Sequence, residues 1–450
     1  MHLSHFGKSD SILRRDGRKA QGVGGMGRNF LMLQGPHGPF FDTLAQHLRV
    51  AGHCVRRIGF NQGDAHFWSD KAHYHPFPAT LDEWPAFLAD FVARQGITDI
   101  VVYGDTRPVH RAAAQLAEDT GLVLHSFEEG YLRPYWITYE RGGANGNSAL
   151  MQLGLAEIAA MTTLSDAPAP VAPATWGALR SHTWLGALYH ANVLFRNGKY
   201  PNFRGHRSET VLQEWMLHCR RGLSIPWHSL QRQLGTARLF RTGMPYHVAL
   251  MQLAHDANMR SHSRLSSMEE FIDVVITGFA RGARPHHRLV FKEHPLEDGR
   301  QPVRRLIAQR AADAGVADRV HYLTGGKLGP LLDRARSVVT INSTAGQQAL
   351  WRGLPLKTFG DAVYCKPEFV SDQPMAQFFA SPTLPDLALY RLFRQFLLET
   401  SQVRGSYYTA RGRRNATRVL VDMMLDDLDP YARSDDKKGT DSKILRLRHA

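Results

Sequence analysis

Cysteine is scarce in this sequence, and its positions exclude two classes of structure. The 450 residues contain three cysteines, Cys54, Cys219 and Cys365, which lie far apart and form no CxxC pair. This spacing supports neither a disulfide framework nor a structural zinc site. A reducing cytoplasm is therefore the expected compartment.

Long apolar runs are also missing. No window approaches the roughly 18 uninterrupted apolar residues that mark a transmembrane helix. Residues 1–28 are basic and glycine-rich, and they lack the continuous apolar core of a signal peptide. We therefore expect a cytoplasmic protein that is neither exported nor membrane-spanning, with residues 1–28 forming a disordered extension.

Acidic residues are too few to balance the basic ones. Lys and Arg number 55 against 41 for Asp and Glu, which gives a formal net charge of +14. Such a surplus favours anionic partners, namely nucleic acid, phospholipid headgroups, nucleotides or acidic sugars. The basic residues are spread along the chain, and no zinc-finger or RNA-recognition motif is present, so we do not expect nucleic acid as a partner.

What the sequence does contain is an alternation of strand and helix patterns. With 43% hydrophobic residues, the chain is long enough for two globular domains. The first half predicts strands at 30–34, from 54, at 97–105 and at 122–130, and helices at about 41–51 and 107–121. The second half predicts strands at 288–295, 319–326, 338–343 and 354–360, and helices at 302–315, 328–337 and 344–353. This alternation predicts an α/β protein with two Rossmann-like, doubly wound domains.

Interruptions of the alternation give the domain borders. A Pro-, Ala- and Thr-rich stretch at 165–177 breaks the pattern, and helical, basic segments follow to about residue 235. We expect an N-terminal Rossmann-like acceptor domain at 29–190, a linker or helical connection at 191–235, a C-terminal Rossmann-like domain at 236–375, C-terminal helices at 376–430 and a charged tail at 431–450. Such sheets bind ligands at the carboxyl ends of their strands, so the active site is expected in a central cleft between the domains.

One strand of the first half ends in two carboxylates. In "HSFEEGYLRPYW", Glu128, Glu129 and Gly130 follow an apolar strand directly. Adjacent carboxylates raise one another's pKa, and the glycine lets the chain turn so that one of them can face a cleft as a general base. The alternative interpretation is a solvent-exposed turn without a catalytic role, which would contain the same residue types. The stretch "EDG" at 297–299 imitates the pattern but ranks lower, since it could simply cap the next helix.

Two strands of the second half end in groups suited to a phosphate. In "HRLVFKEHP", Pro295 stops the strand so that His294 projects at the sheet edge, where it can donate a hydrogen bond to a phosphate oxygen. In "VVTINSTAGQQAL", Asn342, Ser343 and Thr344 lead into a helix whose N–H groups and dipole can bind phosphate. Local capping of the backbone is the alternative interpretation in both places, and N-capping is compatible with phosphate binding.

A glycine-containing turn follows the first strand. In "GPHGPFF" at residues 35–41, Gly35, His37 and Gly38 are too loosely arranged for a dinucleotide fingerprint, which needs a third glycine and a spaced acidic residue. We interpret this turn as a substrate loop on the acceptor side.

Four separated stretches together resemble the KpsS/LipB family of capsule polysaccharide biosynthesis proteins. They are "SFEEGYLRPYWITYE", "HDANMRSHS", "LVFKEHPLEDG" and "VVTINSTAGQQALWRGLPLKTFG". The likeness covers most of residues 30–375 in the family's order. It implies a two-domain GT-B architecture and a β-Kdo glycosyltransferase, which uses CMP-Kdo to begin the Kdo linker of a capsular polysaccharide on a lipid acceptor of the lysophosphatidylglycerol type.

The resemblance also implies roles for the matching residues. Glu129 looks like the general base, with Glu128 as its neighbour. His294 and Pro295 look like a His-Pro motif that contacts the CMP moiety, so that His294 would also steady the leaving group. The other residues implied on the donor side are the hydroxyl pair Ser343 and Thr344, the neighbouring Asn342 and Lys292, and a motif of unassigned roles formed by Arg260, His262 and Ser263.

The implied reaction is an inverting transfer of Kdo. The base takes a proton from an acceptor hydroxyl, the oxygen attacks the anomeric carbon, and CMP departs. A nucleoside monophosphate leaving group needs no metal clamp in this arrangement, so no metal or other cofactor is expected. The anionic lipid acceptor implies peripheral association with the inner membrane through surface charge, and other capsule assembly proteins are candidate partners.

Two alternatives to Kdo transfer stay open. The motifs indicate the CMP part of the donor more specifically than the sugar part, so another CMP-activated acidic sugar, such as a sialic acid, could be the donor. The chain could instead be a non-catalytic capsule assembly or export adaptor, although an adaptor has no need of Glu129, His294 and Ser343 together.

Overall fold

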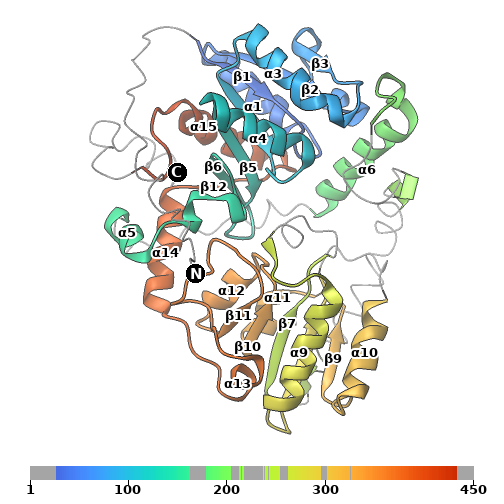
Figure 1. Cartoon of the computed structure of the whole chain (residues 1–450), viewed down its shortest axis with the longest axis vertical. Helices are drawn as coiled ribbons and strands as arrows, with labels where there is room; N and C mark the ends of the chain where they lie inside the picture. Colours follow the sequence, from blue (N-terminus) through green and yellow to red (C-terminus); the bar gives the residue numbers. More distant parts are fainter. Residues whose placement is uncertain are drawn as a thin grey trace, which may run out of the picture.

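The computed structural model describes residues 27–162, 179–203, 212–213, 215–216, 237, 239–241, 243–253, 262–294, 302–324 and 326–432. It contains two α/β domains, drawn in the upper and lower halves of Figure 1. The basic extension, the Pro-rich stretch and the charged tail predicted from the sequence lie almost entirely outside the described residues.

The first domain is built on a seven-stranded sheet of order β12-β6-β5-β4-β1-β2-β3. Its parallel strands are β1 (Asn29–Met32), β2 (Cys54–Gly59), β3 (Tyr74–Pro76), β4 (Asp99–Tyr103) and β5 (Val123–Glu129). The helices between them are α1 (Phe40–Val50), α2 (Gln62–His66), α3 (Trp84–Gln95) and α4 (Pro108–Thr120). The strands and helices predicted for this half are confirmed, but α2, β3 and the whole of α3 lie between residues 62 and 95, where the pattern predicted no helix and no further strand.

Both faces of this sheet are buried. Phe30 and Met32 of β1 pack with α1 in one apolar cluster, whereas Leu31 and Leu33 pack with α3 and α4 in another. A parallel strand covered on both faces needs apolar residues at every position rather than at alternate ones. This explains the continuous apolar run "FLML" at residues 30–33, which starts in β1 and ends one residue after it.

Two antiparallel strands extend the edge of the first sheet. β6 (Trp136–Arg141) pairs with β5, and β12 (Gln402–Arg404) pairs with β6. After β12, helix α15 (Ala410–Leu425) packs against α1 in the core of the first domain. The predicted C-terminal helices therefore return to the first domain, and the sheet is not purely parallel as the alternation had suggested.

The second domain has a five-stranded parallel sheet of order β11-β10-β7-β8-β9. The strands are β7 (Tyr246–Leu250), β8 (Arg288–Lys292), β9 (Val320–Leu323), β10 (Ala335–Thr340) and β11 (Leu356–Thr358). Its helices are α9 (Met268–Gly282), α10 (Val303–Asp313), α11 (Leu328–Leu332), α12 (Gly346–Leu350) and α13 (Met375–Ala380). The predicted helix at 328–337 was too long, because β10 begins at Ala335 and carries the buried pair Val338 and Val339 into the sheet.

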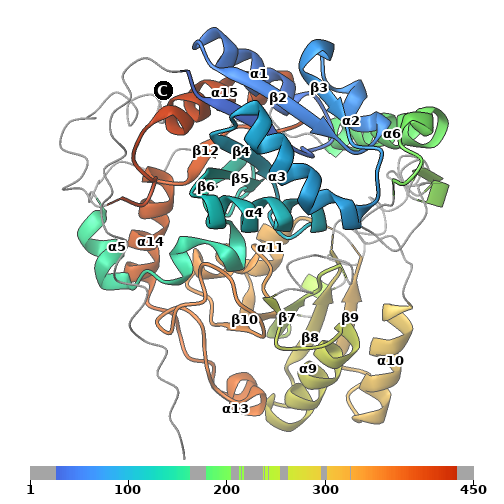
Figure 2. The same ribbon diagram turned by 45° about the horizontal axis from the view of Figure 1, so that its top comes forward.

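The two domains share one apolar core. Helices α5 (Leu155–Met161) and α14 (Leu387–Glu399) pack together where the domains meet, as Figures 1 and 2 show. Gln347 of the second domain donates a hydrogen bond from Nε2 to the carbonyl oxygen of Tyr131 (3.1 Å), and Lys366 Nζ donates to the carbonyl oxygen of Leu150 (2.8 Å). Tyr131 follows the carboxyl end of β5, and Gln347 and Lys366 follow the carboxyl ends of β10 and β11. The carboxyl ends of the two sheets therefore face each other, as a GT-B architecture requires.

Helix α6 (Leu179–Arg196) lies beside the first domain, and it appears in green at the right of Figure 1. The linker predicted to start at residue 191 would begin inside this helix. Short 3₁₀ turns complete the described structure: η1 (Lys71–His73), η2 (Leu81–Glu83), η3 (Asn145–Asn147), η4 (Ala149–Met151) and η6 (Asn197–Lys199).

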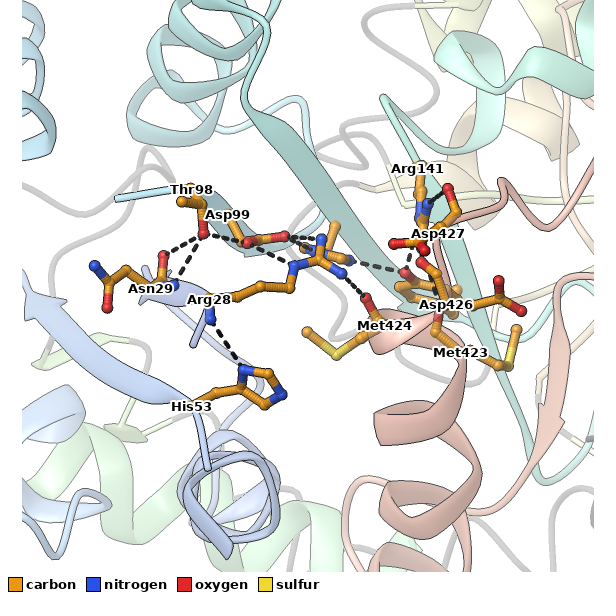
Figure 3. A network of polar contacts seen from close by, with 12 residues as sticks. Arg28, Asn29, His53, Thr98, Asp99, Arg141, Met423, Met424, Asp426 and Asp427 are labelled. Carbon is orange, nitrogen blue, oxygen red and sulfur yellow. Dashed lines mark hydrogen bonds and ion pairs between the residues drawn. The ribbon is translucent and has the colours of Figure 1, made fainter. Parts of the chain in front are cut away.

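A polar network fastens the end of α15 to the first sheet (Figure 3). Arg28 pairs with the fully buried carboxylate of Asp99 and donates from Nη1 to the carbonyl oxygen of Met424 (2.8 Å). Burial opposes ionisation of Asp99, but hydrogen bonds from His125 and Arg28 outweigh it and lower the pKa of the carboxyl. Arg141 donates to the carbonyl oxygen of Met423 (3.2 Å), so two guanidinium groups satisfy carbonyl groups at the carboxyl end of the helix.

Candidate functional site

The acidic pair occupies the last two positions of β5, where successive side chains point to opposite faces of the sheet. Glu129 Oε1 accepts hydrogen bonds from the hydroxyl groups of Tyr103 (3.2 Å) and Tyr408 (3.0 Å). Glu128 Oε2 accepts instead from Asn145 Nδ2 (3.2 Å), in the loop after β6. The two carboxyl groups therefore have different neighbours and need not have the same role.

Glu128 has the pKa of a group that titrates near neutral pH. Burial raises its pKa to about 7, and the charges of Glu129 and Asp105 act in the same direction. The backbone N–H of Glu129, which donates to Glu128 Oε1 at 3.0 Å, opposes the rise. A carboxyl group of this kind can take up and release a proton at the pH of a cell.

The end of β8 holds Lys292, Glu293 and His294. Lys292 is only 5% exposed, and its Nζ donates to the carbonyl oxygen of Glu293 (2.9 Å). The hydroxyl group of Tyr322 donates to Glu293 Oε1 (2.7 Å). These contacts hold Lys292 and Glu293 in the turn after β8, and His294 follows the strand at a partly exposed position. Pro295 lies outside the described residues.

The end of β10 is tied to the end of β7. Gln252 Nε2 donates to Asn342 Oδ1, and the Asn342 backbone N–H donates to Gln252 Oε1, both at 2.9 Å. Ser343 Oγ accepts from the backbone N–H of Ala345 (3.2 Å) within the turn before α12. The N-cap of α12 is Ala345, so the alternative of helix capping by Ser343 or Thr344 is not what the structure has. The helix after Thr344, α12, is only five residues long, so its dipole is small, and phosphate binding here stays a prediction.

The His262 and Ser263 motif lies at the same edge of the second sheet. The backbone N–H of Asp361 donates to the carbonyl oxygen of His262 (2.8 Å), and Ser263 Oγ accepts from the backbone N–H of Leu265 (2.9 Å). The His262 ring packs on Gly146 of the first domain so closely that a Cβ there would lie 2.3 Å from Nδ1. Arg260 lies outside the described residues.

The contact between Gly146 and His262 joins the two halves of the site. Gly146 is next to Asn145, which donates to Glu128, so the motif from the second domain lies beside the loop that holds the acidic pair. His262 Nε2 is buried and has no hydrogen-bond partner within the described part of the chain. Sequence reasoning missed Asn145, because a loop asparagine carries no pattern of its own.

The acceptor-side turn packs against α6. The His37 ring stacks on Tyr189 with centroids 4.2 Å apart, and Gly38, at φ +131°, leaves room for Leu185, whose Cδ1 would lie 3.0 Å from a Cβ at Gly38. Gly35 lies against the Phe41 ring with similar closeness. The turn therefore positions α6 at the carboxyl edge of the first sheet, and its role in acceptor binding stays a prediction.

Tyr189 is the centre of a buried polar cluster beneath α6. Its hydroxyl group accepts from Asn61 Nδ2 (2.7 Å) and Gln34 Nε2 (3.0 Å), and donates to Asp64 Oδ1 (3.2 Å). Arg107 Nη1 in turn donates to Gln34 Oε1 (2.9 Å). A pocket opens beside this cluster, with Gln34 and Arg107 as polar groups in an otherwise largely apolar wall.

Two searches of the described residues bear on metals and membranes. No group of three or more His, Cys, Asp or Glu side chains among them could hold a metal ion. No helix in the described ranges is long and apolar enough to cross a bilayer. The expectation that the chemistry needs no metal stays a prediction.

The fold is that of an α/β protein with two Rossmann-like domains whose strand ends face each other at the domain junction, which is where doubly wound sheets bind their ligands. Residues 98–408 match the sequence model of the family described as "Capsule polysaccharide biosynthesis protein", and the chain belongs to this family. The resemblance predicted from the four motifs is thereby confirmed.

Curated relatives include two capsule proteins. The chain is 32% identical over 390 residues to the capsule polysaccharide export protein KpsS of Escherichia coli, covering 85% of this chain and 97% of that protein. It is 31% identical over 400 residues to the capsule polysaccharide modification protein LipB of Neisseria meningitidis serogroup A, covering 85% and 92%. Among solved structures, the β-Kdo 2,7 transferase of KpsC from Thermosulfurimonas dismutans matches with a TM-score of 0.40 and 13% identity, over 88% of this chain and 100% of that one.

Proposed function

We propose that this capsule biosynthesis protein transfers Kdo from CMP-Kdo, with inversion, to an anionic lipid acceptor of the lysophosphatidylglycerol type at the inner membrane, and so starts the Kdo linker of a capsular polysaccharide. The observation that carries the proposal is Glu128, a carboxyl group with a pKa of about 7 at the domain junction. A group with this pKa, held beside a donor-side motif, is suited to general base catalysis.

Glu128 is the better candidate for the base on geometric grounds. Its carboxyl group contacts the loop that meets the second domain, whereas Glu129 is held by two tyrosine hydroxyl groups of the first domain. Glu129, which the family resemblance nominates, is the rival, and a pair of substitutions can decide between them. In either case the acceptor hydroxyl gives its proton to a carboxylate while its oxygen attacks the anomeric carbon.

The second domain supplies the leaving-group side of the reaction. The bond from the anomeric carbon to the phosphate oxygen breaks, and CMP carries away the electron pair. A hydrogen bond from His294, with help from the hydroxyl groups of Ser343 and Thr344, would stabilise the charge that develops on the phosphate. Lys292 and Asn342 have a supporting role, because their side chains hold the ends of β8 and β10.

A transfer assay tests the reaction. Purified protein is incubated with CMP-Kdo and a fluorescent lysophosphatidylglycerol, and the product is identified by mass. We expect an acceptor one Kdo heavier, together with released CMP, and competition experiments with CMP-activated sialic acid identify the preferred donor. Binding of capsular polysaccharide without any turnover of either donor would favour the adaptor alternative instead.

Calorimetry tests the donor site separately. CMP should bind in the presence of EDTA, because the proposed contacts are a histidine and hydroxyl groups, and His294→Ala should weaken binding. His286→Ala is the matched control, since His286 is exposed and precedes the amino end of β8, at the opposite edge of the sheet. A strict requirement for added Mg²⁺, or equal loss in both variants, would contradict this assignment.

A further inference from the structure

Helix α6 is apolar on two opposite faces, and only one of them is used in the fold. Tyr189, Asn192 and Val193 of the inner face are each at most 6% exposed. The Tyr189 ring lies directly on Gly63 of α2, where a Cβ would come within 2.6 Å of ring atoms. Packing on the first domain therefore accounts for the inner face.

The outer face of α6 carries a second set of apolar side chains. Trp184, Leu188, Ala191 and Phe195 recur every three or four residues and form one apolar stripe along the helix, which the charged Arg180 continues at its amino end. Trp184 and Phe195 are each 69% exposed, which is far more than large aromatic residues usually show. A surface helix that carries apolar side chains on its solvent-facing side as well as on its inner side is expected to bind a second partner there.

The apolar surface continues beyond the helix. Trp215 meets the Phe195 ring edge to face at a centroid distance of 5.9 Å. Its neighbours Leu212 and Met216 are 46% and 47% exposed. Exposed apolar residues thus gather at one place on the protein, whereas single exposed ones elsewhere need no explanation.

The charged residues of α6 and η6 are all basic, and the nearest acidic residues in the sequence are Asp166 on one side and Glu209 and Glu214 on the other. Residues 167–208 contain no Asp or Glu, and Arg180, Arg196 and Lys199 are exposed beside the aromatic residues. Two copies of such a surface would repel each other, which disfavours self-association. Aromatic rings flanked by Arg and Lys are instead the composition that binds the interface of an anionic membrane.

We propose that the outer face of α6 docks the protein on an anionic lipid bilayer. We call this surface the α6 stripe and define it as Arg180, Trp184 and Phe195 of the outer face together with the exposed Arg196 and Lys199 at the carboxyl end of the helix. The aromatic rings enter the headgroup region, and the basic side chains pair with lipid phosphates. This docking rests on the proposed function, because a transferase with a lipid acceptor has to contact the membrane that holds the lipid.

The position of the stripe fits the delivery of a lipid acceptor. The chain leaves α6 through η6, and Asn202 and Phe203 then line the pocket that contains Arg107 at the carboxyl edge of the first sheet. Docking through the stripe therefore holds the acceptor domain, with this pocket, next to the bilayer. Surface charge alone would leave the orientation of the protein undefined.

Vesicle flotation tests the α6 stripe with the full-length protein. Vesicles of phosphatidylglycerol and phosphatidylcholine are compared with vesicles of phosphatidylcholine alone. We expect Trp184→Gln/Phe195→Gln to weaken partitioning into anionic vesicles by at least about tenfold, because two large side chains lose their apolar burial. The matched control is Val50→Gln/Leu384→Gln, which removes two side chains that are 88% and 72% exposed elsewhere and should leave partitioning unchanged.

Salt separates the two contributions of the stripe. Removing one of Arg180, Arg196 or Lys199 should weaken partitioning about fivefold at low salt. In about 1 M salt the Debye length falls to about 3 Å, so the charge contribution disappears for every variant. The wild type should then keep a residual partitioning that the aromatic double variant lacks.

Three outcomes would overturn the proposal. The aromatic double variant could bind anionic vesicles as strongly as the wild type does. The control variant Val50→Gln/Leu384→Gln could also lose as much partitioning as the aromatic double variant. Alternatively, the wild type could form a dimer in solution that the double variant cannot form, in which case the stripe binds a second copy of the chain. Matching melting temperatures and circular dichroism spectra establish that each variant is folded.

A soluble acceptor distinguishes this proposal from the proposed function. With a short-chain lysophosphatidylglycerol below its micelle concentration, the double variant should turn over CMP-Kdo like the wild type, since no bilayer is involved. Vesicle binding that depends on the stripe, without turnover by the wild type, would refute the transferase and leave the docking surface standing. Turnover without such binding would do the reverse.

Discussion

The sharpest prediction compares the two carboxyl groups at the end of β5. Glu128→Gln leaves one acceptor oxygen for Asn145, gives up the hydrogen bond that the backbone N–H of Glu129 donates to the other oxygen, and removes the ability to take a proton. General base catalysis contributes roughly 10²- to 10⁴-fold, so turnover should fall by that factor while CMP binding persists. Glu129→Gln still offers an oxygen to its two tyrosine partners and should cost less than about tenfold.

The pH dependence of kcat/KM is an independent test of which of the two carboxyl groups is the base. Because burial raises the pKa of Glu128 to about 7, the carboxyl group is protonated and inactive as a base below that pH. In the wild type kcat/KM should therefore rise about tenfold per pH unit below neutrality and level off above it. In Glu128→Gln this dependence should be absent from the remaining activity, whereas Glu129→Gln should keep it.

The assay is steady-state release of CMP over pH 5.5 to 8.5, with Glu118→Gln, an exposed carboxyl group on α4, as the control. The reasoning would be refuted if Glu129→Gln lost the large factor while Glu128→Gln kept both turnover and the dependence near pH 7. The base would then be Glu129, as the family resemblance implies.

Three further predictions concern stability. Burial raises the pKa of Glu140 from 4.5 to about 8, so the folded state keeps a proton that the unfolded chain releases. This group should lower the free energy of unfolding by about 2 kcal/mol between pH 6 and 8, and Glu140→Gln should remove that part of the slope in urea titrations. Arg28→Ala leaves the buried carboxylate of Asp99 without its guanidinium partner and should cost about 3 to 5 kcal/mol of unfolding free energy by the same method. Gly146→Ala should lower the melting temperature because its Cβ meets the histidine ring of the second domain, whereas Gly198→Ala, which has open space, should not. A flat pH slope in the wild type, or equal effects of paired variants, would contradict the respective argument.

The alternation of strands and helices was predictable because each element carries its own periodicity. β1 shows it as a continuous apolar run, because both faces of the strand are buried, and α1 and α4 show it as apolar residues spaced along one side of the helix. β7 was missed although it is the central strand of the second sheet, because "YHVAL" is only five residues long and contains a histidine. The buried His247 is satisfied by Ser337, 90 residues away, which no local pattern reveals.

The candidate site was predictable in its residue types but not in its surroundings. A strand that ends in two carboxylates indicates an acidic pair, and the sequence located it correctly at the carboxyl end of β5. Which hydrogen bonds each carboxyl group accepts depends on Asn145 and on Tyr408, which is 279 residues from Glu129. The exposure of Trp184 likewise depends on which face of α6 meets α2, so the sequence alone could not single it out.

The return of β12 to the first sheet restricts how the two domains can be exchanged between relatives. β6 keeps one edge without a strand until residues 402–404 are in place, and the face of α1 that α15 covers stays exposed until residues 410–425 pack on it. A chimera that joined a foreign second domain after residue 203 would therefore have to take residues 402–425 from the same parent as the first domain. The first domain is thus discontinuous in sequence. Recombination at a single point between the domains would separate the first sheet from its edge strand β12.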